Sequence, residues 1–206
     1  MTLLGQKVFA LHRALERGGV PHAFGGAIAL AYAVNEARAT HDIDINIFLL
    51  PGDAGRVLSA LPTEVRVRAE DGKTLSRDGQ VRLRWGDNPV DLFLSTVPLH
   101  DVAARRTRSV PFETDTIPIV SATDLTVFKA MYGRGKDWVD IEAMRDAGTV
   151  DGAEAIRWVE DMLGADHDHH VRLLHILSQP PRPPTERDEL PPALRPGQSG
   201  QSSPGH

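Results

Sequence analysis

The sequence contains no cysteine in its 206 residues. A disulfide framework, a thiolate metal site and a cysteine nucleophile are therefore excluded. The sequence also has no uninterrupted apolar run of roughly eighteen residues, the length that marks a candidate transmembrane helix. Charged residues interrupt the apolar stretch near the N-terminus, which differs from the layout of a secretory signal. We therefore expect a cytoplasmic protein without a membrane segment.

Charge of either sign is moderate, and lysine is scarce. The formal net charge of −5 at pH 7 argues against a general nucleic-acid coat. The sequence has 19 arginines and only 4 lysines, so the position of each lysine is of interest. Hydrophobic residues make up 41% and charged residues 25%, as in a globular protein rather than in collagen, a coiled coil or a disordered chain.

The order of hydrophobic patterns predicts an α+β fold, in which a mixed β-sheet with flanking helices is followed by a helical C-terminal part. A first helix is predicted from apolar residues at helical spacing, namely Leu4, Val8, Leu11 and Leu15. Alternating or apolar runs predict strands in residues 42–50, 65–69, 80–85 and 90–95. Beyond residue 116 the pattern is helical, with capping sequences that begin at Ser121 and Asp151.

We divide the chain into a sheet-containing core in residues 1–115, a helical domain in residues 116–178 and a tail in residues 179–206. The tail holds eight of the 15 prolines and ends in glycine, serine and glutamine. Such a segment buries too little apolar surface to offset its ordering entropy. We therefore predict that the tail is disordered.

A glycine pair, Gly25-Gly26, lies between a short extended segment and an alanine-rich helical run in residues 27–34. Glycine lets the backbone approach a ligand closely, and the N–H groups that open a helix suit a phosphate. A purely structural turn is the alternative interpretation, because glycine pairs are common in turns.

Asp42 and Asp44 lie in a strongly alternating strand. Because side chains on a strand alternate between its faces, both carboxylates and Asn46 lie on one face, and the isoleucines between them lie on the other. Adjacent like charges repel unless a cation lies between them, and Mg²⁺ is commonly held by one or two carboxylates plus substrate phosphates. The alternative is a solvated polar face on an edge strand.

Asp91 is a single carboxylate in an apolar strand, residues 90–94. A buried carboxylate in such a run requires a partner or a metal ion to offset its desolvation. The alternative is an aspartate at the end of a strand, in contact with solvent.

A glycine-pair loop, a helix, a strand with the pattern Asp-x-Asp and a third aspartate on a later strand together resemble the nucleotidyltransferase superfamily related to polymerase β. The segments FGGAIALAY and RATHDIDI, together with KAMYGRGKDWVDI in residues 129–141, resemble more specifically the AbiEii/MenT branch of toxin nucleotidyltransferases. The resemblance covers about residues 20–146. Many members have Gly-Ser where this chain has Gly25-Gly26, so this chain lacks a hydroxyl that would be available to contact phosphate.

The resemblance implies transfer of a nucleoside monophosphate from an NTP to an acceptor hydroxyl, with one or two Mg²⁺ ions. Residues 1–115 would form the catalytic core. Asp42, Asp44 and Asp91 would be the metal ligands and catalytic carboxylates, and the backbone amides of Gly25 and Gly26 would bind the β- and γ-phosphates.

Two lysines complete the site that the resemblance implies. Lys129 would act in catalysis and neutralise the triphosphate, and Lys136 would bind nucleotide beside Arg134. Asp137 or Asp140 would orient Lys129 or a substrate. A lysine that merely extends over an apolar surface is the alternative for Lys129.

The resemblance further implies that the acceptor is the 3′ end of tRNA, that the protein is a toxin, and that a cognate antitoxin protein is its partner. Alternating arginines predict a basic ribbon for RNA or, alternatively, solvated charges on an edge strand; they are Arg66, Arg68, Arg82 and Arg84. Nucleotidylation of a protein or a small molecule, and binding without catalysis, remain alternative functions.

The histidines of residues 166–170 are interpreted as a solvated helix start rather than a zinc site.

Overall fold

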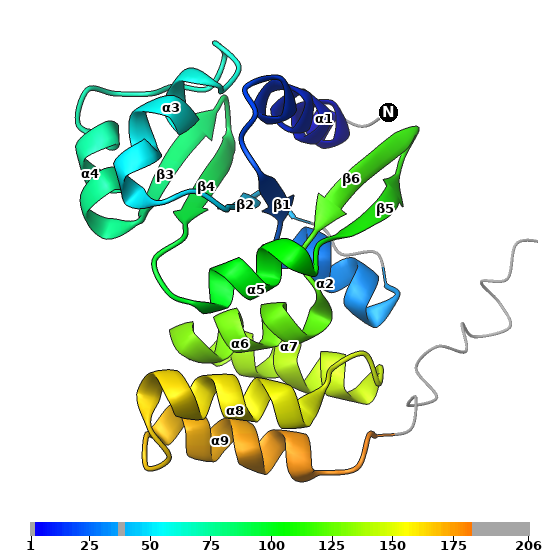
Figure 1. Cartoon of the computed structure of the whole chain (residues 1–206). Helices are drawn as coiled ribbons and strands as arrows, with labels where there is room; N and C mark the ends of the chain where they lie inside the picture. Colours follow the sequence, from blue (N-terminus) through cyan, green and yellow to red (C-terminus); the bar gives the residue numbers. More distant parts are fainter. Residues whose placement is uncertain (1–2, 37–39, 183–206) are drawn as a thin grey trace, which may run out of the picture.

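A computed structural model describes residues 3–36 and 40–182 (Figure 1). Its centre is a six-stranded mixed sheet with the strand order β3-β4-β2-β1-β6-β5. The strands are β1 (His22–Phe24), β2 (Ile43–Ile47), β3 (Gln80–Trp85), β4 (Asn88–Leu94), β5 (Arg108–Phe112) and β6 (Asp115–Ile119). The predicted α+β fold with a mixed sheet is confirmed.

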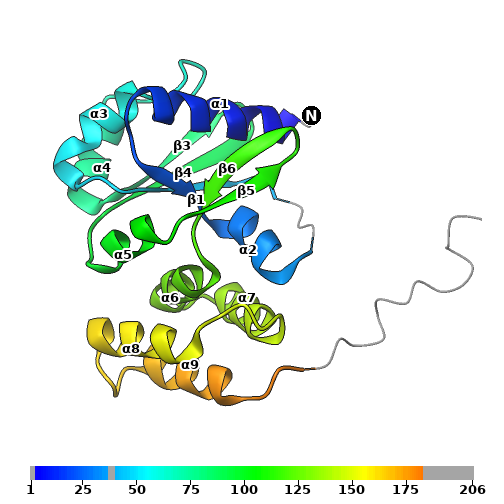
Figure 2. The same cartoon turned by 45° about the vertical axis from the view of Figure 1, so that its right-hand side comes forward.

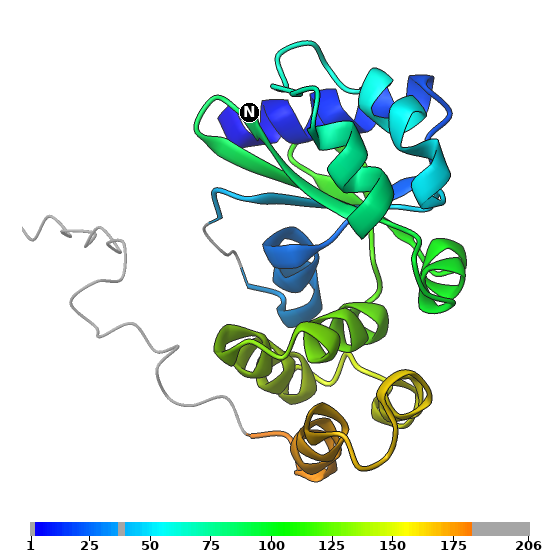
Figure 3. The ribbon, with the colours of Figure 1, turned by 90° about the vertical axis from the view of Figure 1, so that its left-hand side faces the viewer.

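Helices surround the sheet and form the C-terminal part. They are α1 (Leu3–Arg17), α2 (Gly26–Val34), α3 (Ala54–Ser59), α4 (Asp71–Asp78), α5 (Leu99–Arg105), α6 (Ala122–Tyr132), α7 (Gly135–Asp146), α8 (Gly152–Leu163) and α9 (Asp168–Ser178), with a 3₁₀ turn, η1 (Pro51–Asp53). Helix α1 lies across one face of the sheet, and α2 and α5 lie on the opposite side (Figure 2). Below them, α6 with α7 and then α8 with α9 form two further layers, so that α2 lies between the sheet and α6–α7 (Figure 3).

The alternation of β2 decides which face of the sheet carries the polar residues. Ile43, Ile45 and Ile47 are fully buried in the core. Because neighbouring side chains of a strand point to opposite faces, Asp44 lies on the other face, towards α2. The apolar residues of β4 continue the same core, and β2 pairs with β4 in parallel. The burial of the isoleucines therefore fixes the orientation of Asp44.

Two parts of the fold differ from the sequence expectations. The strand predicted in residues 65–69 is wrong, because only Arg66 pairs, in an isolated bridge with Arg84, and Val67 is 41% exposed. Conversely, the hairpin of β5 and β6 was not predicted, since each strand contains a proline, which disfavours a strand assignment. The structure tolerates Pro118 because β1 pairs with β6 only between Phe24 and Ile119.

The helical C-terminal part begins as its capping sequences predict. The hydroxyl of Ser121 accepts a hydrogen bond from the Asp124 amide at 3.1 Å, and the Asp151 carboxylate accepts one from the Glu154 amide at 3.0 Å. In the part of the chain that the structure describes, none of the helices is long and apolar enough to cross a bilayer. The division of the chain at residue 115 stays a prediction, and the predicted disordered tail lies, from residue 183 onward, outside the described residues.

Candidate active site

The two central carboxylates lie side by side on neighbouring strands. In the parallel pairing of β2 with β4, Asp44 is directly opposite Asp91. Paired residues of adjacent strands present their side chains on the same face, so both carboxylates face away from the core. Asp42 lies two residues before Asp44, and its side chain is 41% exposed. The fold thus gathers the three predicted metal ligands at one place.

The Asp44 carboxylate is half-buried beside other negative charges. Burial, followed by the charges of Asp91 and Asp42, raises its pKa from 3.8 to about 6, and Lys129 and Lys136 oppose this rise. Among the described residues, none donates a hydrogen bond to the Asp44 side chain. A half-buried carboxylate with these neighbours favours a bound cation.

The glycine pair is required by the close approach of α2 to Asp44. Gly26 has a φ of +50°, and a Cβ at this position would lie 1.9 Å from Asp44 Oδ2. The amide of Gly25 donates to the Asp44 carbonyl oxygen at 2.9 Å, so it is not available for a phosphate. Helical hydrogen bonding starts with the Ala29 amide, which leaves the amides of Gly26, Ala27 and Ile28 without acceptors inside the helix.

Arg82 is a site residue for which the sequence suggested another role. Its Nε and Nη2 donate to Asp91 Oδ1 and Oδ2 at 2.8 and 2.6 Å, and Nη2 lies 3.5 Å from Asp42 Oδ2. The predicted RNA-binding ribbon is therefore corrected at this position, because Arg82 binds the carboxylates. A turn at Gly86 and Asp87 places Arg82 opposite Asp91 in the β3–β4 hairpin, and this pairing was available from the sequence.

Lys129 of α6 is held by two acidic residues of α7. Its Nζ lies 2.6 Å from Asp140 Oδ2 and 3.4 Å from Asp137 Oδ1. Asp137 is fully buried, and Arg134 also binds it, with 2.7 Å between Nε and Oδ2. Although burial raises the pKa of Asp137, these cations hold it below its ordinary value. The side chain of Lys129 is only 11% exposed, so the surrounding residues restrict its position.

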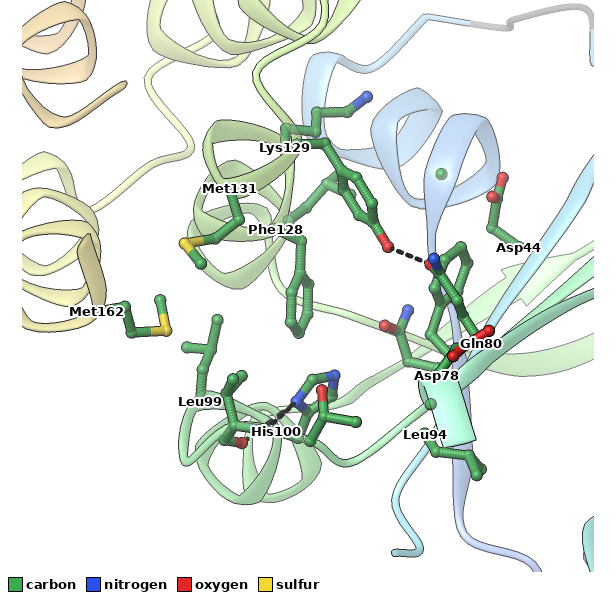
Figure 4. A pocket seen from close by; sticks show the side chains of 18 of the residues that line it. Asp44, Asp78, Gln80, Leu94, Leu99, His100, Phe128, Lys129, Met131 and Met162 are labelled. Carbon is green, nitrogen blue, oxygen red and sulfur yellow. Dashed lines mark hydrogen bonds between the residues drawn. The ribbon is translucent and has the colours of Figure 1, made fainter. Parts of the chain in front are cut away.

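Two adjoining cavities lie at these residues. The larger one, of about 700 Å³, is lined by most of the predicted site residues: Gly26, Asp42, Asp44, Asp91, Lys129 and Lys136. The smaller one, of about 300 Å³, has mainly apolar walls and is shown in Figure 4. Both are lined by Asp44 and Lys129, so the cavities meet at the centre of the candidate site.

The donor atoms at the site suit a magnesium ion that also binds phosphate. Within residues 3–36 and 40–182, no three acidic or histidine side chains form a ready-made metal site. Mg²⁺ rarely uses such a cage and more often binds one or two carboxylates together with substrate phosphates. Asp44 and Asp42 fit this pattern, whereas Asp91 is engaged by Arg82.

The histidines of residues 166–170 lie elsewhere. His169 packs against Trp138, with 5.6 Å between the ring centroids, and His170 contacts the Ala165 carbonyl oxygen at 2.7 Å. The side chain of His167 caps α9. These residues do begin a helix, as interpreted, but the start is only partly solvated, because His170 is buried and His169 is half-buried.

No protein-family model and no curated protein matches the sequence. Among solved structures, the fold is similar to the antibiotic-resistance factor ANT(2″)-Ia in solution, with a TM-score of 0.53 and 15% identity over 77% of this chain and 90% of that chain. The chain has a nucleotidyltransferase fold. A nucleotidyltransferase-like protein from Paracoccidioides brasiliensis also matches, with a TM-score of 0.49 and 15% identity over 84% of this chain and 86% of that chain. At these identities the comparison establishes the nucleotidyltransferase fold alone.

We expect the substitution Arg82→Met to strengthen the binding of a divalent cation. Its guanidinium competes for Asp91 and Asp42. Because the Arg82 side chain is 60% exposed, we take the contribution of its ion pairs as about 1 kcal/mol, so the affinity should rise roughly fivefold. Titration with Mn²⁺, followed by electron paramagnetic resonance, measures this affinity. Arg84→Met, on the same strand, is the control and should leave it unchanged; an Arg82→Met protein with unchanged or weaker Mn²⁺ binding would contradict the competition.

Proposed function

We propose that this protein is a Mg²⁺-dependent nucleotidyltransferase that moves a nucleoside monophosphate from an NTP to an acceptor hydroxyl. The observation that carries the proposal is the pairing of Asp44 with Asp91, next to the glycine N-terminus of α2. Beside this pair lies a cavity with several basic side chains, including Lys129, Arg134 and Lys136. Carboxylates for a metal and cations for a triphosphate thus lie together.

In this proposal each group has a defined part. Asp42 and Asp44 hold Mg²⁺, which when bound neutralises phosphate charge and lowers the pKa of the acceptor hydroxyl. Lys129, positioned by Asp137 and Asp140, binds the phosphates as a compact cation. The free amides that open α2 are further phosphate donors.

The reaction forms one bond and breaks another. The acceptor oxygen attacks the α-phosphorus, and the bond from the α-phosphorus to the oxygen that bridges to the β-phosphate breaks. Pyrophosphate leaves, and the hydroxyl proton is released to water. The basic side chains of the larger cavity stabilise the charge that develops on the leaving pyrophosphate.

We propose RNA as the acceptor, with the 3′ end of tRNA as the first candidate. Arg84 follows Arg82 on the same face of the edge strand β3, and Arg66 pairs with Arg84. Arg66 and Arg84 are thus paired basic residues beside the site, two positions along β3 from Arg82, and they support an anionic acceptor that approaches from this side. The choice of tRNA, the toxin role and a cognate antitoxin protein are supported by the resemblance in residues 20–146.

Labelled nucleotides test the proposal. Each α-labelled NTP is incubated with total tRNA, Mg²⁺ and one of three proteins: the wild type, Asp44→Asn, or the control Asp161→Asn, which changes an exposed residue of α8. We expect label in tRNA with the wild type and Asp161→Asn, and a loss of at least about a thousandfold with Asp44→Asn.

Other outcomes decide between the remaining functions. Label in a protein or small molecule, but not in tRNA, would reject the tRNA acceptor and retain the transfer reaction. NTP binding without transfer to any acceptor in a cell extract would favour a non-catalytic binding protein. For the toxin role, expression of the wild type should arrest growth and expression of Asp44→Asn should not.

A further inference from the structure

The smaller cavity has no part in the chemistry described so far. It lies beside Asp44, between the sheet and α6, and it extends as far as Met162 of α8. In Figure 4, Asp44 and Gln80 lie on one side of it, Met131 and Met162 lie on the other, and the Phe128 ring lies between them. Its volume of about 300 Å³ suits part of a small molecule rather than a polymer.

Aromatic rings in fixed positions line this cavity. Phe128 packs against His100, with 5.1 Å between the ring centroids. Tyr132 donates a hydrogen bond from its hydroxyl to Gln80 Oε1 at 3.0 Å, and the guanidinium of Arg134 lies 5.0 Å from the Tyr132 ring centroid. Any nucleobase can stack on such side chains, because every base has a flat aromatic face.

Polar groups are placed between the apolar walls. Because Gln80 Oε1 accepts from Tyr132, the amide NH₂ of Gln80 keeps its donors for a ligand. Nδ1 of His100 lies 3.2 Å from the Val97 carbonyl oxygen and 3.4 Å from the Val97 amide nitrogen, and burial lowers the pKa of His100, so Nε2 of the neutral ring donates or accepts according to the tautomer. The amide donors of Gln80 and Nε2 of His100, beside stacking surfaces, match the edge and the faces of a nucleobase.

The arrangement of the two cavities separates the nucleobase from the acceptor. Asp91 and Arg82 line the larger cavity but not the smaller one, so the acceptor approaches through the larger cavity. The basic groups of the larger cavity take the triphosphate. The α-phosphate joins the nucleoside to the other two phosphates. Because both cavities meet at Asp44, the smaller cavity is left for the nucleoside.

We propose that the smaller cavity binds the nucleobase of the NTP, with Phe128 as its stacking surface and Gln80 and His100 as its polar contacts. This inference rests on the proposed function. It assigns the choice between nucleotides to residues of β3, α5 and α6 that the metal and the phosphates do not contact.

Calorimetric titration tests the assignment with two probes in the presence of Mg²⁺. One probe is whichever of ATP, CTP, GTP and UTP binds the wild type most tightly, and the other is tripolyphosphate, which has no base. The variants are Phe128→Leu, which removes the ring, and Val97→Trp, which fills the cavity. Phe112→Leu is the matched control, because Phe112 is also half-buried but packs on Phe9, away from the cavity.

We expect Phe128→Leu and Val97→Trp each to weaken NTP binding roughly tenfold, the typical effect of losing one stacked base contact. Tripolyphosphate binding should stay unchanged in both variants, and Phe112→Leu should change neither affinity. Unchanged NTP binding in both cavity variants would overturn the proposal, as would an equal loss for both probes. A wild type that binds the NTP no better than tripolyphosphate would overturn the nucleobase site alone. A wild type that binds neither probe would overturn the proposed function as well.

Discussion

Asp44→Asn is expected to make the ligand-free protein more stable at about pH 8, by about 3 kcal/mol, although it removes nucleotidyl transfer. Burial and the charges of Asp91 and Asp42 raise the pKa of Asp44 from 3.8 to about 6, so its ionised form is costly in the folded state. One pKa unit corresponds to about 1.4 kcal/mol, and a neutral amide carries no such cost. Urea unfolding of both proteins measures the difference.

The pH dependence of this difference has a definite sign. The folded state binds the Asp44 proton more tightly than the unfolded state, so the stability that this proton contributes is complete below a pH of about 3.8 and is lost as the pH rises through about 6. The wild type and Asp44→Asn should therefore unfold at similar urea concentrations below a pH of about 3.8, diverge as the pH rises to about 6, and keep the full difference above that pH.

Asp42→Asn is the comparison for this measurement. Its side chain is 41% exposed, so the same substitution should stabilise the protein much less. If Asp44→Asn lowered the free energy of unfolding at about pH 8, the Asp44 carboxylate would have a stabilising partner in solution, and the argument for a cation position at Asp44 would fail.

Gly26→Ala is expected to destabilise the protein by about 3 kcal/mol and to abolish NTP binding. The added Cβ would overlap Asp44 Oδ2, and an L side chain is disfavoured at a φ of +50°. Either the start of α2 or Asp44 must move. Thermal unfolding and NTP titration measure the two effects, and Gly55→Ala, which has no atoms within 4 Å of its Cβ, should not be destabilised.

A double variant separates the clash from the backbone strain. Asp44→Ala removes the carboxylate that the added Cβ would meet, so Gly26→Ala should cost about 1 to 2 kcal/mol less in that background. The remaining cost comes from the positive φ. Strictly additive free energies of unfolding would show that the glycine is required for a reason other than its approach to Asp44.

Local patterns in the sequence predicted the elements that build the centre of the site. The alternation of β2 placed Asp44 on the face opposite the buried isoleucines, and the capping sequence at Ser121 located the start of the helix that carries Lys129. Both predictions depend only on residues a few positions apart. Periodicity and capping are local properties, so a single sequence is sufficient to show them.

The rest depends on contacts between residues that are distant in the sequence. The side-by-side placement of Asp44 and Asp91 follows from the parallel pairing of β2 with β4, which no local pattern specifies. The hydrogen bond between Tyr132 and Gln80, which helps to form the smaller cavity, joins residues 52 positions apart. The roles of these residues therefore became visible only in the folded chain.

The contacts of the basic side chains have a consequence for how ions compete at the site. Arg82, Lys129 and Arg134 each already contact a carboxylate of the protein. A triphosphate that binds these side chains replaces a carboxylate of the protein as their counterion. It therefore displaces few ions from the surrounding solution. NTP binding should then depend less steeply on salt concentration than the number of basic side chains implies, because that dependence reflects the release of dissolved counterions. The protein would thus keep its nucleotide over a broad range of ionic strength.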